Sequence, residues 1–355
     1  MNLDELRKRI DDIDARIVEL IAERQAVSGE IGKGKQQTNR VIQDRERERA
    51  VIRQVRGMAR DKNISPSDVE SIYRQIIKAS KKIQGVAVAY QGEPGAYTEE
   101  AAMLFFGEST EGRPYDSLDE VFEVVEAAAV PFAMVPVENS LEGSITRAYD
   151  LLLDSPLMVC GEMELRISHC LIANAGTGLD SIRTVYSHPQ ALGQSRRFLQ
   201  HLGCEVVPES DTAGSVRMIK EQGLTDSAAV ASARAAEIYG MTILAREIED
   251  NPHNFTRFFV LSKEDSPPTG NDKTSIVFSL KHKPGALYDC LREFASREVN
   301  LTKLESRPTR NQPWEYNFYM DFSGHHQEAG IGQALEALKE HAVFVRILGS
   351  YPKAR

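Results

Sequence analysis

The sequence predicts three parts with different folds: an all-α N-terminal part, an α/β middle part and a ferredoxin-like α+β C-terminal part. Three observations support this. Residues 1–84 show no strand pattern, residues 86–263 alternate short apolar runs with helical stretches, and residues 274–351 follow the order βαββαβ. The length of 355 residues agrees with two or three domains of roughly 150 residues each.

The N-terminal part is predicted to consist of long helices. In the first, apolar residues recur at spacings of four and three, at Leu6, Ile10, Ile13, Ile17, Leu20, Val27 and Ile31. We expect helices over residues 3–33 and about 42–60, and a third that begins with Ser65 as N-cap and Pro66 at its first position. Helices this long and this charged cannot enclose a core alone, so we expect a homo-oligomer, either a dimer or a tetramer.

In the middle part, short apolar runs predict buried strands and the stretches between them predict helices. The strands are expected at residues 86–90, 132–137, 185–187, 205–207, 228–231 and 258–261. The helices are expected at residues 97–106, 191–202, 213–222 and 232–239. This pattern indicates mostly parallel sheets, and active sites in such folds lie where loops leave the carboxyl ends of the strands.

Residues 264–273, rich in proline, glycine and charge, are predicted to form a linker. Beyond it, we expect strands at residues 275–280, 301–307, 315–322 and 343–348, with helices at residues 285–298 and 328–341. This order of elements is the split βαβ arrangement of ferredoxin-like folds.

Composition and charge exclude several classes of function. The chain has 43 Lys and Arg against 52 Asp and Glu, and the net charge of −9 argues against a nucleic acid as partner. No stretch approaches ~18 consecutive apolar residues and the N-terminus does not resemble a signal peptide, so we expect a cytoplasmic protein with no membrane partner. The histidines lack metal-binding spacing, and His325-His326 is interpreted as loop surface, so neither a metal nor another cofactor is expected.

Polar side chains occupy positions on the apolar faces of the predicted helices. They are Arg24, Asp44, Glu48, Ser80 and Gln84. A buried arginine needs partners, and one interpretation is a structural pair of Arg24 with Glu48 or Asp44. The other is a polar pocket for a small anion, which is favoured because all the helices contribute to it. Further cations stand nearby at Arg7, Lys35 and Arg47.

These residues resemble the all-helical chorismate mutase family over the whole of residues 1–84. The resemblance rests on Leu6-Arg7, Asp14, Ala22-Glu23-Arg24, Gly32-Lys33-Gly34-Lys35, Asp44-Arg45-Glu46-Arg47-Glu48, Ser80 and Gln84. It implies that Arg24 and Arg47 hold the two carboxylates of chorismate, with Arg7 arriving from a partner subunit. It also implies that Lys35 and Gln84 bond to the ether oxygen, while Asp44, Glu48 and Ser80 hold hydroxyl and backbone groups.

A Claisen rearrangement, the reaction of that family, needs neither a nucleophile nor a general base. The site must hold the substrate in a compact conformation and stabilise negative charge that grows on the ether oxygen. Cations and an amide can do both, and Glu48 would help if burial kept it protonated.

Polar stretches of the middle part stand beside predicted strands. They are residues 136–145, which follow an apolar strand and are expected to open a helix, residues 187–194, with the same layout, and residues 254–258, which lead into a buried strand. Amide, hydroxyl and helix N-terminal N–H groups that converge there would suit a carboxylate. Each stretch alone is also compatible with ordinary capping, and His188, which precedes Pro189, is interpreted as structural.

Together these stretches resemble the prephenate dehydratase family over residues 86–263. Gln91-Gly92, Gly95-Ala96-Tyr97, Asp211-Thr212-Ala213 and residues 229–240 complete the match. The resemblance implies two α/β lobes, as in periplasmic binding proteins, and a prephenate site made of Glu138, Asn139, Ser140, Ser187, Gln194, Thr212, Thr256 and Arg257. Thr256 would be the chief catalytic residue, alone or in a relay with Glu138, and Arg257 the main cationic anchor.

Two stretches of the C-terminal part, Lys283-Pro284-Gly285-Ala286-Leu287 and Glu305-Ser306-Arg307-Pro308, resemble motifs of the regulatory ACT domain family. Without the resemblance, a plain turn would explain the first of them. The resemblance implies pairing of two such domains and a phenylalanine site. Its residues would be Gly285, Ala286, Leu287, Glu305, Ser306 and Arg307.

The sequence therefore predicts an enzyme that rearranges chorismate to prephenate, converts prephenate to phenylpyruvate, and is inhibited by phenylalanine. Two other interpretations stay open: a two-lobed sensor gated by the ACT domain, with vestigial catalytic residues, and a helical part that serves only as a structural dimer. A dehydrogenase acting on the same substrate is disfavoured, because no GxGxxG motif follows a predicted strand.

Overall fold

The computed structural model describes residues 2–37, 45–83, 85–107, 109–309 and 315–354, and only the backbone of residues 31–37, 45–49, 78 and 81–83. The chain forms two compact units, residues 1–87 with 103–111 and residues 88–102 with 112–355. No helix in this described part of the chain has the length and apolar character that crossing a membrane requires.

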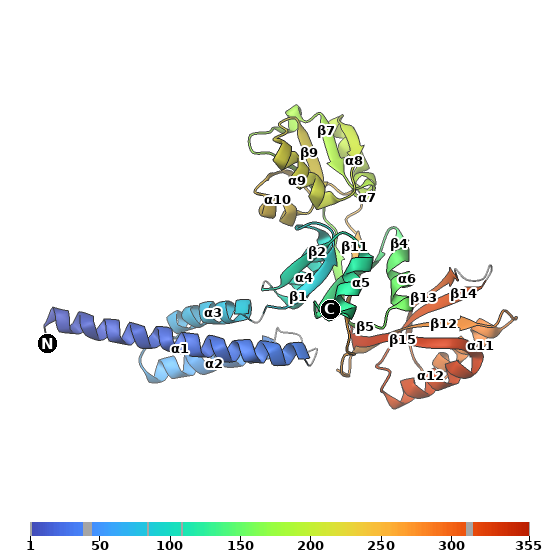
Figure 1. The fold of residues 1–355 in the computed structure, drawn as a ribbon, viewed down its shortest axis with the longest axis horizontal. Coiled ribbons are helices and arrows are strands. Elements are labelled where there is room, and N and C mark those ends of the chain that lie inside the picture. The colour runs from blue at the N-terminus through green and yellow to red at the C-terminus, as the bar shows by residue number, and fades with distance from the viewer. Residues whose placement is uncertain (1, 38–44, 84, 108, 310–314, 355) are drawn as a thin grey trace. The chain divides into compact units, whose positions relative to one another are not determined.

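The described residues of the N-terminal part form helices α1 (Leu3–Gln37), α2 (Arg45–Asp61) and α3 (Pro66–Ile83), and α3 packs against both α1 and α2 (Figure 1). The predicted cap of α3 is confirmed, because Ser65 Oγ accepts a hydrogen bond from the backbone N–H of Asp68 at 3.4 Å. The first helix continues four residues beyond its predicted end. The predicted start of the second, at residue 42, lies outside the described residues.

The apolar stripe of α1 stays exposed within this unit. Ile10 is 57% exposed and Leu20 is 62% exposed, although their spacing predicts a buried face. Val55 and Ala59 of α2 belong to the small core that does form.

Across its described residues, the middle part forms two sheets, and the first has the strand order β2-β1-β3-β11-β5. Its elements are β1 (Ala87–Gln91), α4 (Tyr97–Phe106), β2 (Glu111–Tyr115), α5 (Leu118–Glu126), β3 (Phe132–Asn139), β4 (Gly143–Ser144), α6 (Thr146–Asp154), β5 (Met158–Arg166) and β11 (Phe255–Ser262). Strand β11 lies between β3 and β5 and is antiparallel to both. It therefore occupies the interior of the sheet.

The second sheet has the order β10-β6-β9-β7-β8. Its elements are β6 (Cys170–Ala173), the 3₁₀ helix η1 (Leu179–Ser181), β7 (Thr184–Ser187), α7 (Pro189–Gln194), α8 (Arg196–Leu202), β8 (Glu205–Pro208), α9 (Thr212–Gln222), β9 (Ser227–Ala231), α10 (Ala233–Tyr239) and β10 (Thr242–Arg246). The chain enters this sheet after β5 and returns to the first sheet at β11. The middle part thus has two lobes joined by two crossing segments, as predicted.

The expectation of mostly parallel sheets is wrong, because both sheets are mixed. Parallel pairing joins β1 with β3 and β7 with both β8 and β9, whereas β11 and β6 are antiparallel to their neighbours. A strand in the interior of a sheet reads as a continuous apolar run whichever way it points. Strands β2, β4, β5, β6 and β10 and helix α5 were not predicted, and α7 and α8, predicted as one helix, separate at Ser195.

The C-terminal part confirms the predicted βαββαβ order, with strand order β13-β14-β12-β15. Its elements are β12 (Asp272–Leu280), α11 (Ala286–Ala295), β13 (Leu301–Pro308), β14 (Tyr316–Ser323), α12 (Ala329–His341) and β15 (Ala342–Pro352). Helices α11 and α12 lie side by side on one face of the sheet (Figure 1). Phe278, Phe294 and Phe322 form the core beneath them.

The opposite face of this sheet packs against the middle part. Strand β15 crosses β5 so closely that a Cβ atom at Gly349 would lie 2.1 Å from the carbonyl oxygen of Val159. The segment predicted as a linker is also fixed, since Ser266 is buried and the Asp272 carboxylate accepts from the backbone N–H groups of Thr269 and Gly270 at 2.8 and 3.0 Å. The C-terminal part is therefore docked on its neighbour by direct contact.

Candidate active site

A cavity of about 310 Å³ is lined by residues of both lobes of the middle part. Of the predicted prephenate residues, Asn139, Gln194, Thr212 and Thr256 line it. The sequence reading did not assign a role there to further polar lining residues, which are Tyr97, Thr98, Glu142, Ser144, His169, His188 and Gln190. His188 also caps α7, because its Nδ1 accepts from the backbone N–H of Gln190 at 3.3 Å.

The amide of Asn139 fixes the direction of the hydrogen bonds around Thr256. Its Oδ1 accepts from the backbone N–H groups of Leu141 and Glu142 at 3.0 and 3.2 Å, which identifies the oxygen. Its Nδ2 donates to Asn254 Oδ1 at 2.8 Å and to Thr256 Oγ1 at 3.0 Å. Thr256 Oγ1 thus accepts from Asn139. No described group takes the hydroxyl hydrogen of Thr256, which can be donated into the cavity.

A second set of directed hydrogen bonds runs from Asn254 to the far wall of the cavity. Asn254 is fully buried, and its Nδ2 donates to Gln194 Oε1 at 2.8 Å. Gln194 Nε2 donates to the Glu142 carboxylate at 3.1 Å, so Oε1 is the acceptor end of this amide. His169 Nε2 lies 2.9 Å from the same Oε1 and therefore carries a hydrogen, while its Nδ1 lies 2.8 Å from the hydroxyl of Tyr97.

Burial lowers the pKa of His169 below the usual histidine value, although the hydrogen bond that it donates to Gln194 and the charge of Glu249 partly oppose this effect. The imidazole is therefore neutral near pH 7, with its hydrogen on Nε2. In this form Nδ1 can only accept, and the single hydroxyl hydrogen of Tyr97 has two acceptors at 2.8 Å, this nitrogen and the carbonyl of Ser168. The side chains of Asn139, Asn254 and Gln194 thus have defined donor and acceptor ends at the cavity wall.

We expect the free energy of unfolding to fall in acid because of His169. Its folded-state pKa is lowered, so the stability it contributes is complete above the ordinary value of 6.5 and is lost as the pH falls through the folded-state pKa. Urea unfolding at about pH 7.5 and about pH 5.5 should show a larger loss for the wild type than for His169→Gln. Burial also lowers the pKa of His326, but this residue is present in both proteins and its contribution cancels. Equal losses in the two proteins would contradict the assignment.

Two predicted prephenate residues hold the backbone instead of facing the cavity. Ser187 is fully buried, and its Oγ donates to the carbonyl of Val230 at 2.5 Å, which ties β7 to β9. Ser140 is exposed, donates to the carbonyl of His253 at 3.1 Å and accepts from the N–H of Phe255 at 2.9 Å. Residues 136–145 also form the β3–β4 hairpin before α6 begins, so they do not open a helix directly as predicted.

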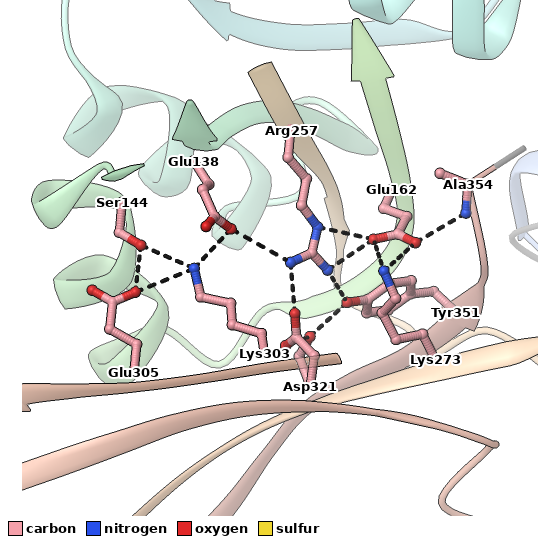
Figure 2. Close-up of polar contacts among 11 residues, drawn as sticks. Glu138, Ser144, Glu162, Arg257, Lys273, Lys303, Glu305, Asp321, Tyr351 and Ala354 are labelled. Atoms are coloured by element: carbon pink, nitrogen blue, oxygen red, sulfur yellow. Dashed lines mark hydrogen bonds and ion pairs between the residues drawn. The ribbon is translucent and has the colours of Figure 1, made fainter. Parts of the chain in front are cut away.

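Glu138 and Arg257, which the resemblance assigns to the prephenate site, do not line the cavity in this structure. Their side chains lie on the face of the first sheet that packs against the C-terminal part (Figure 2). Arg257 bonds Glu162 and Asp321, and Glu138 accepts from Lys303 at 2.7 Å. Side chains alternate along a strand, so the neighbours of Asn139 and Thr256 point away from the cavity.

In the helical unit, Arg24 and Ser80 are brought together as predicted. Nη1 of Arg24 donates to the hydroxyl of Ser80, which is buried and donates in turn to the carbonyl of Ile76 at 2.9 Å. Arg7 is exposed and pairs with Asp4 at 3.6 Å. The other predicted chorismate residues lie outside the residues whose side chains are described. They are Lys35, Asp44, Arg47, Glu48 and Gln84.

The predicted phenylalanine residues fall into two groups. Gly285 adopts φ +82° at the start of α11, and Ala286 and Leu287 pack into the core, so this motif offers backbone N–H groups. On β13, Glu305 accepts from Ser144 and Arg307 lies 3.8 Å from Asp150, so both face the middle part, while Ser306 is exposed on the other side of the strand. Within the described residues, no hydrogen bond or ion pair joins the two motifs.

His325 and His326 are not the exposed loop pair that the sequence suggested, because His325 is fully buried. Together with Asp265 they form a cluster of the kind that can hold a metal ion. Nε2 of His325, however, donates to the carbonyl of Ser266 at 2.9 Å, and Nδ1 accepts from the N–H of Gln327 at 3.2 Å. Both ring nitrogens are already used, so this cluster has a structural explanation.

Family models match the chain in three consecutive segments. They are chorismate mutase type II over residues 6–85, prephenate dehydratase over residues 88–266 and ACT domain over residues 274–340. A bifunctional chorismate mutase/prephenate dehydratase of Stutzerimonas stutzeri is 40% identical over 360 residues, which cover 98% of this chain and 97% of the relative.

Solved structures resemble the part of the chain that follows the helices. A prephenate dehydratase from Arthrobacter aurescens in complex with L-Phe has a TM-score of 0.70 and 33% identity, and the match covers 76% of this chain and 90% of that one. A protein described as a quorum quenching acylase, GqqA, has the same TM-score at 35% identity and covers 75% of this chain and 97% of that one.

Proposed function

Because this chain belongs to the family of bifunctional chorismate mutase/prephenate dehydratases, with an ACT domain at its C-terminal end, we propose roles for its residues in the two reactions. The enzyme rearranges chorismate to prephenate and converts prephenate to phenylpyruvate, and phenylalanine inhibits it through the ACT domain. The geometry described above supports roles for some of the residues in each step.

Thr256 is the residue that assists the departing hydroxyl of prephenate. The observation behind this role is the hydrogen bond from Asn139 Nδ2 to Thr256 Oγ1 at 3.0 Å, which leaves the threonine hydrogen for the substrate. The bond between the ring and the carboxylate breaks, CO₂ leaves and the electron pair of that bond enters the ring. Hydroxide leaves from the opposite side and takes a proton from the solvent to become water. Threonine is a weak acid, so it stabilises the growing negative charge by a hydrogen bond. Glu138 is engaged with Lys303, which argues against a relay through it.

The N-terminus of α6 binds a carboxylate of prephenate, in place of the arginine expected from the sequence. None of the described residues that line the cavity is Lys or Arg. Helices α6, α7 and α9 begin at the cavity, where Ile145, Gln190 and Thr212 line it. The side chains of His188 and Asp211 cap α7 and α9, whereas no side chain caps α6, so the N–H groups of Thr146 and Arg147 at its start are available to an anion.

Arg24 binds a carboxylate of chorismate in the helical unit. Its partner among the described side chains is the neutral hydroxyl of Ser80, which leaves the charge of the guanidinium available to an anionic substrate. The roles implied for Arg7, Lys35, Asp44, Arg47, Glu48 and Gln84 rest on the resemblance.

A second copy of the chain covers the exposed stripe of α1. Leu6, Ile13 and Ile17 are 40%, 51% and 48% exposed although they follow the spacing of a buried helix face. A long stripe of this kind is stabilised when the same stripe of a partner packs against it. This supports a homo-oligomer in which Arg7 reaches the site of the partner subunit.

The complete function is tested by supplying purified protein with chorismate and following chorismate loss and phenylpyruvate formation, with and without phenylalanine. We expect phenylpyruvate to form and phenylalanine to suppress it. Prephenate supplied directly should give the same product. Accumulation of prephenate from chorismate would contradict the dehydratase assignment, and turnover insensitive to phenylalanine would contradict regulation by the ACT domain.

A further inference from the structure

Strand β11 presents one face to the substrate cavity and the other to the ACT sheet, which consists of β12, β13, β14 and β15. Thr256 lines the cavity, and Arg257, the next residue, points to the opposite side. Both residues pair with β3, where Thr256 is opposite Asn139 and Arg257 is opposite Glu138. A contact that holds or displaces the side chain of Arg257 therefore acts on β11 one residue away from Thr256.

The guanidinium of Arg257 is held by a closed ring of hydrogen bonds to the ACT sheet (Figure 2). Nη1 donates to Asp321 Oδ2 at 2.6 Å, and Nη2 donates to the hydroxyl of Tyr351 at 2.9 Å. The hydroxyl of Ser275 lies 2.5 Å from that of Tyr351 and donates to Asp321 Oδ1 at 2.6 Å. Because Ser275 donates to Asp321, Tyr351 donates to Ser275, and every member of the ring has one defined direction.

The remaining donors of Arg257 bind within its own lobe. Nε donates to Glu162 Oε2 at 2.9 Å, and Lys273 of β12 lies 2.8 Å from the other oxygen of the same carboxylate. Glu162 is fully buried at its side chain and Arg257 is 11% exposed. Burial alone would raise the pKa of Glu162, but the charges of Arg257 and Lys273 outweigh it and hold the pKa below the usual range. Glu162 is thus ionised, and it is held by charge-assisted hydrogen bonds from Arg257 and Lys273.

A second contact acts on the strand that carries Asn139. Nζ of Lys303, from β13, donates to Glu138 Oε2 at 2.7 Å and to Ser144 Oγ at 2.9 Å (Figure 2). Glu138 precedes Asn139 on β3, and Ser144 itself lines the cavity. The ACT sheet therefore fixes the neighbours of both residues that form the Thr256–Asn139 hydrogen bond.

We propose that Arg257 is a positioning residue of the dehydratase, held by Asp321 and Tyr351 of the ACT sheet so that β11 presents Thr256 to prephenate in its reactive position. This inference rests on the proposed role of Thr256. It gives the ACT sheet a part in the basal reaction, in the absence of phenylalanine, and it gives Arg257 a function other than binding the substrate.

The test is steady-state kinetics of the full chain with prephenate, comparing the wild type with Asp321→Asn. The substitution keeps the shape of the side chain and removes the charge that orients Arg257. We expect kcat to fall roughly 10- to 100-fold, as for a misplaced catalytic group, and KM to change less than about threefold. A wild-type kcat, or a raised KM with unchanged kcat, would overturn the proposal.

Two further variants separate positioning from loss of the fold. Tyr351→Phe keeps the buried ring but opens the hydrogen-bond ring, and we expect a smaller fall in kcat with KM again unchanged. If Asp321→Asn fails to fold, a wild-type kcat in Tyr351→Phe overturns the proposal. Asp150→Asn is the matched control, because Asp150 contacts Arg307 in the same interface and belongs to α6, not to β3 or β11, and it should keep its kcat.

The kinetics also distinguish this inference from the proposed function. Wild-type protein that makes no phenylpyruvate from prephenate would refute the dehydratase assignment. Active wild type with an equally active Asp321→Asn variant would refute only the positioning role. In every sample, mutase turnover with chorismate measures the amount of functional protein independently.

Discussion

Replacing Thr256 with valine is expected to remove almost all dehydratase turnover and to leave mutase turnover unchanged. Valine matches the shape of threonine and lacks its hydroxyl, while Asn139 Nδ2 keeps Asn254 Oδ1 at 2.8 Å and the carbonyl of Phe255 at 3.2 Å as acceptors. Loss of one donor that stabilises developing negative charge costs on the order of 10²- to 10³-fold in kcat. The measurement is kcat for prephenate, with chorismate turnover followed in the same samples.

Two variants control this experiment. Thr256→Ser restores the hydroxyl without the methyl group and should recover much of the lost kcat. Thr242→Val makes the same chemical change at an exposed residue of β10 that does not line the cavity, and it should stay near the wild-type kcat. Wild-type turnover by Thr256→Val would eliminate the proposed role, whatever the behaviour of the other two variants.

The polar residues at the site were easier to predict from the sequence than the directions in which they point. Asn139, Gln194 and Thr256 lie in polar stretches that the fold brings to one cavity. Glu138 and Arg257 lie in the same stretches, but the alternation of side chains along β3 and β11 sends them to the other face. A motif of consecutive residues in a strand always divides between two faces, and the sequence alone does not say which face is the site.

His169 escaped prediction because of the direction of its strand. It stands directly before β6, at the amino end of the strand, whereas the site residues were expected after the carboxyl ends of strands. Strand β6 is antiparallel to β9 and β10, so its amino end lies at the edge where the carboxyl end of β9 lies. The signal in the sequence was a histidine immediately before an apolar run. This signal identifies a site residue only when the sheet is known to be mixed.

The three-part division followed from local patterns, but the contacts between the middle and C-terminal parts did not. Lys303, Asp321 and Tyr351 read as ordinary polar residues of strands, since alternation allows one solvated face on an antiparallel sheet. Their role depends on Glu138 and Arg257, which lie far away in the sequence. These ion pairs and hydrogen bonds form only when the two parts dock, and no residue pattern within either part predicts them.

Arg24→Ala is expected to abolish most chorismate mutase turnover while kcat for prephenate stays at the wild-type value. The resemblance implies that Arg24 holds a carboxylate of chorismate, and its partner among the described side chains is a neutral hydroxyl. Removing the guanidinium should lower kcat/KM for chorismate on the order of 10²- to 10³-fold. Arg24→Lys should recover only part of this loss, because lysine keeps the positive charge but lacks the planar pair of donors that binds a carboxylate.

The same variant decides between the two interpretations of Arg24. If Arg24 is structural, the substitution should lower the unfolding temperature and leave kcat/KM of the folded fraction intact. If Arg24 binds the substrate, the substitution should lower kcat/KM and leave the unfolding temperature unchanged. Truncation also leaves Ser80 Oγ without its donor, but this hydroxyl still donates to the carbonyl of Ile76 at 2.9 Å, which limits the structural cost. Arg16→Ala, on the exposed surface of α1, serves as the matched control and should keep wild-type kinetics. Wild-type kcat/KM in Arg24→Ala would assign the residue to the fold and leave the mutase site to be sought elsewhere.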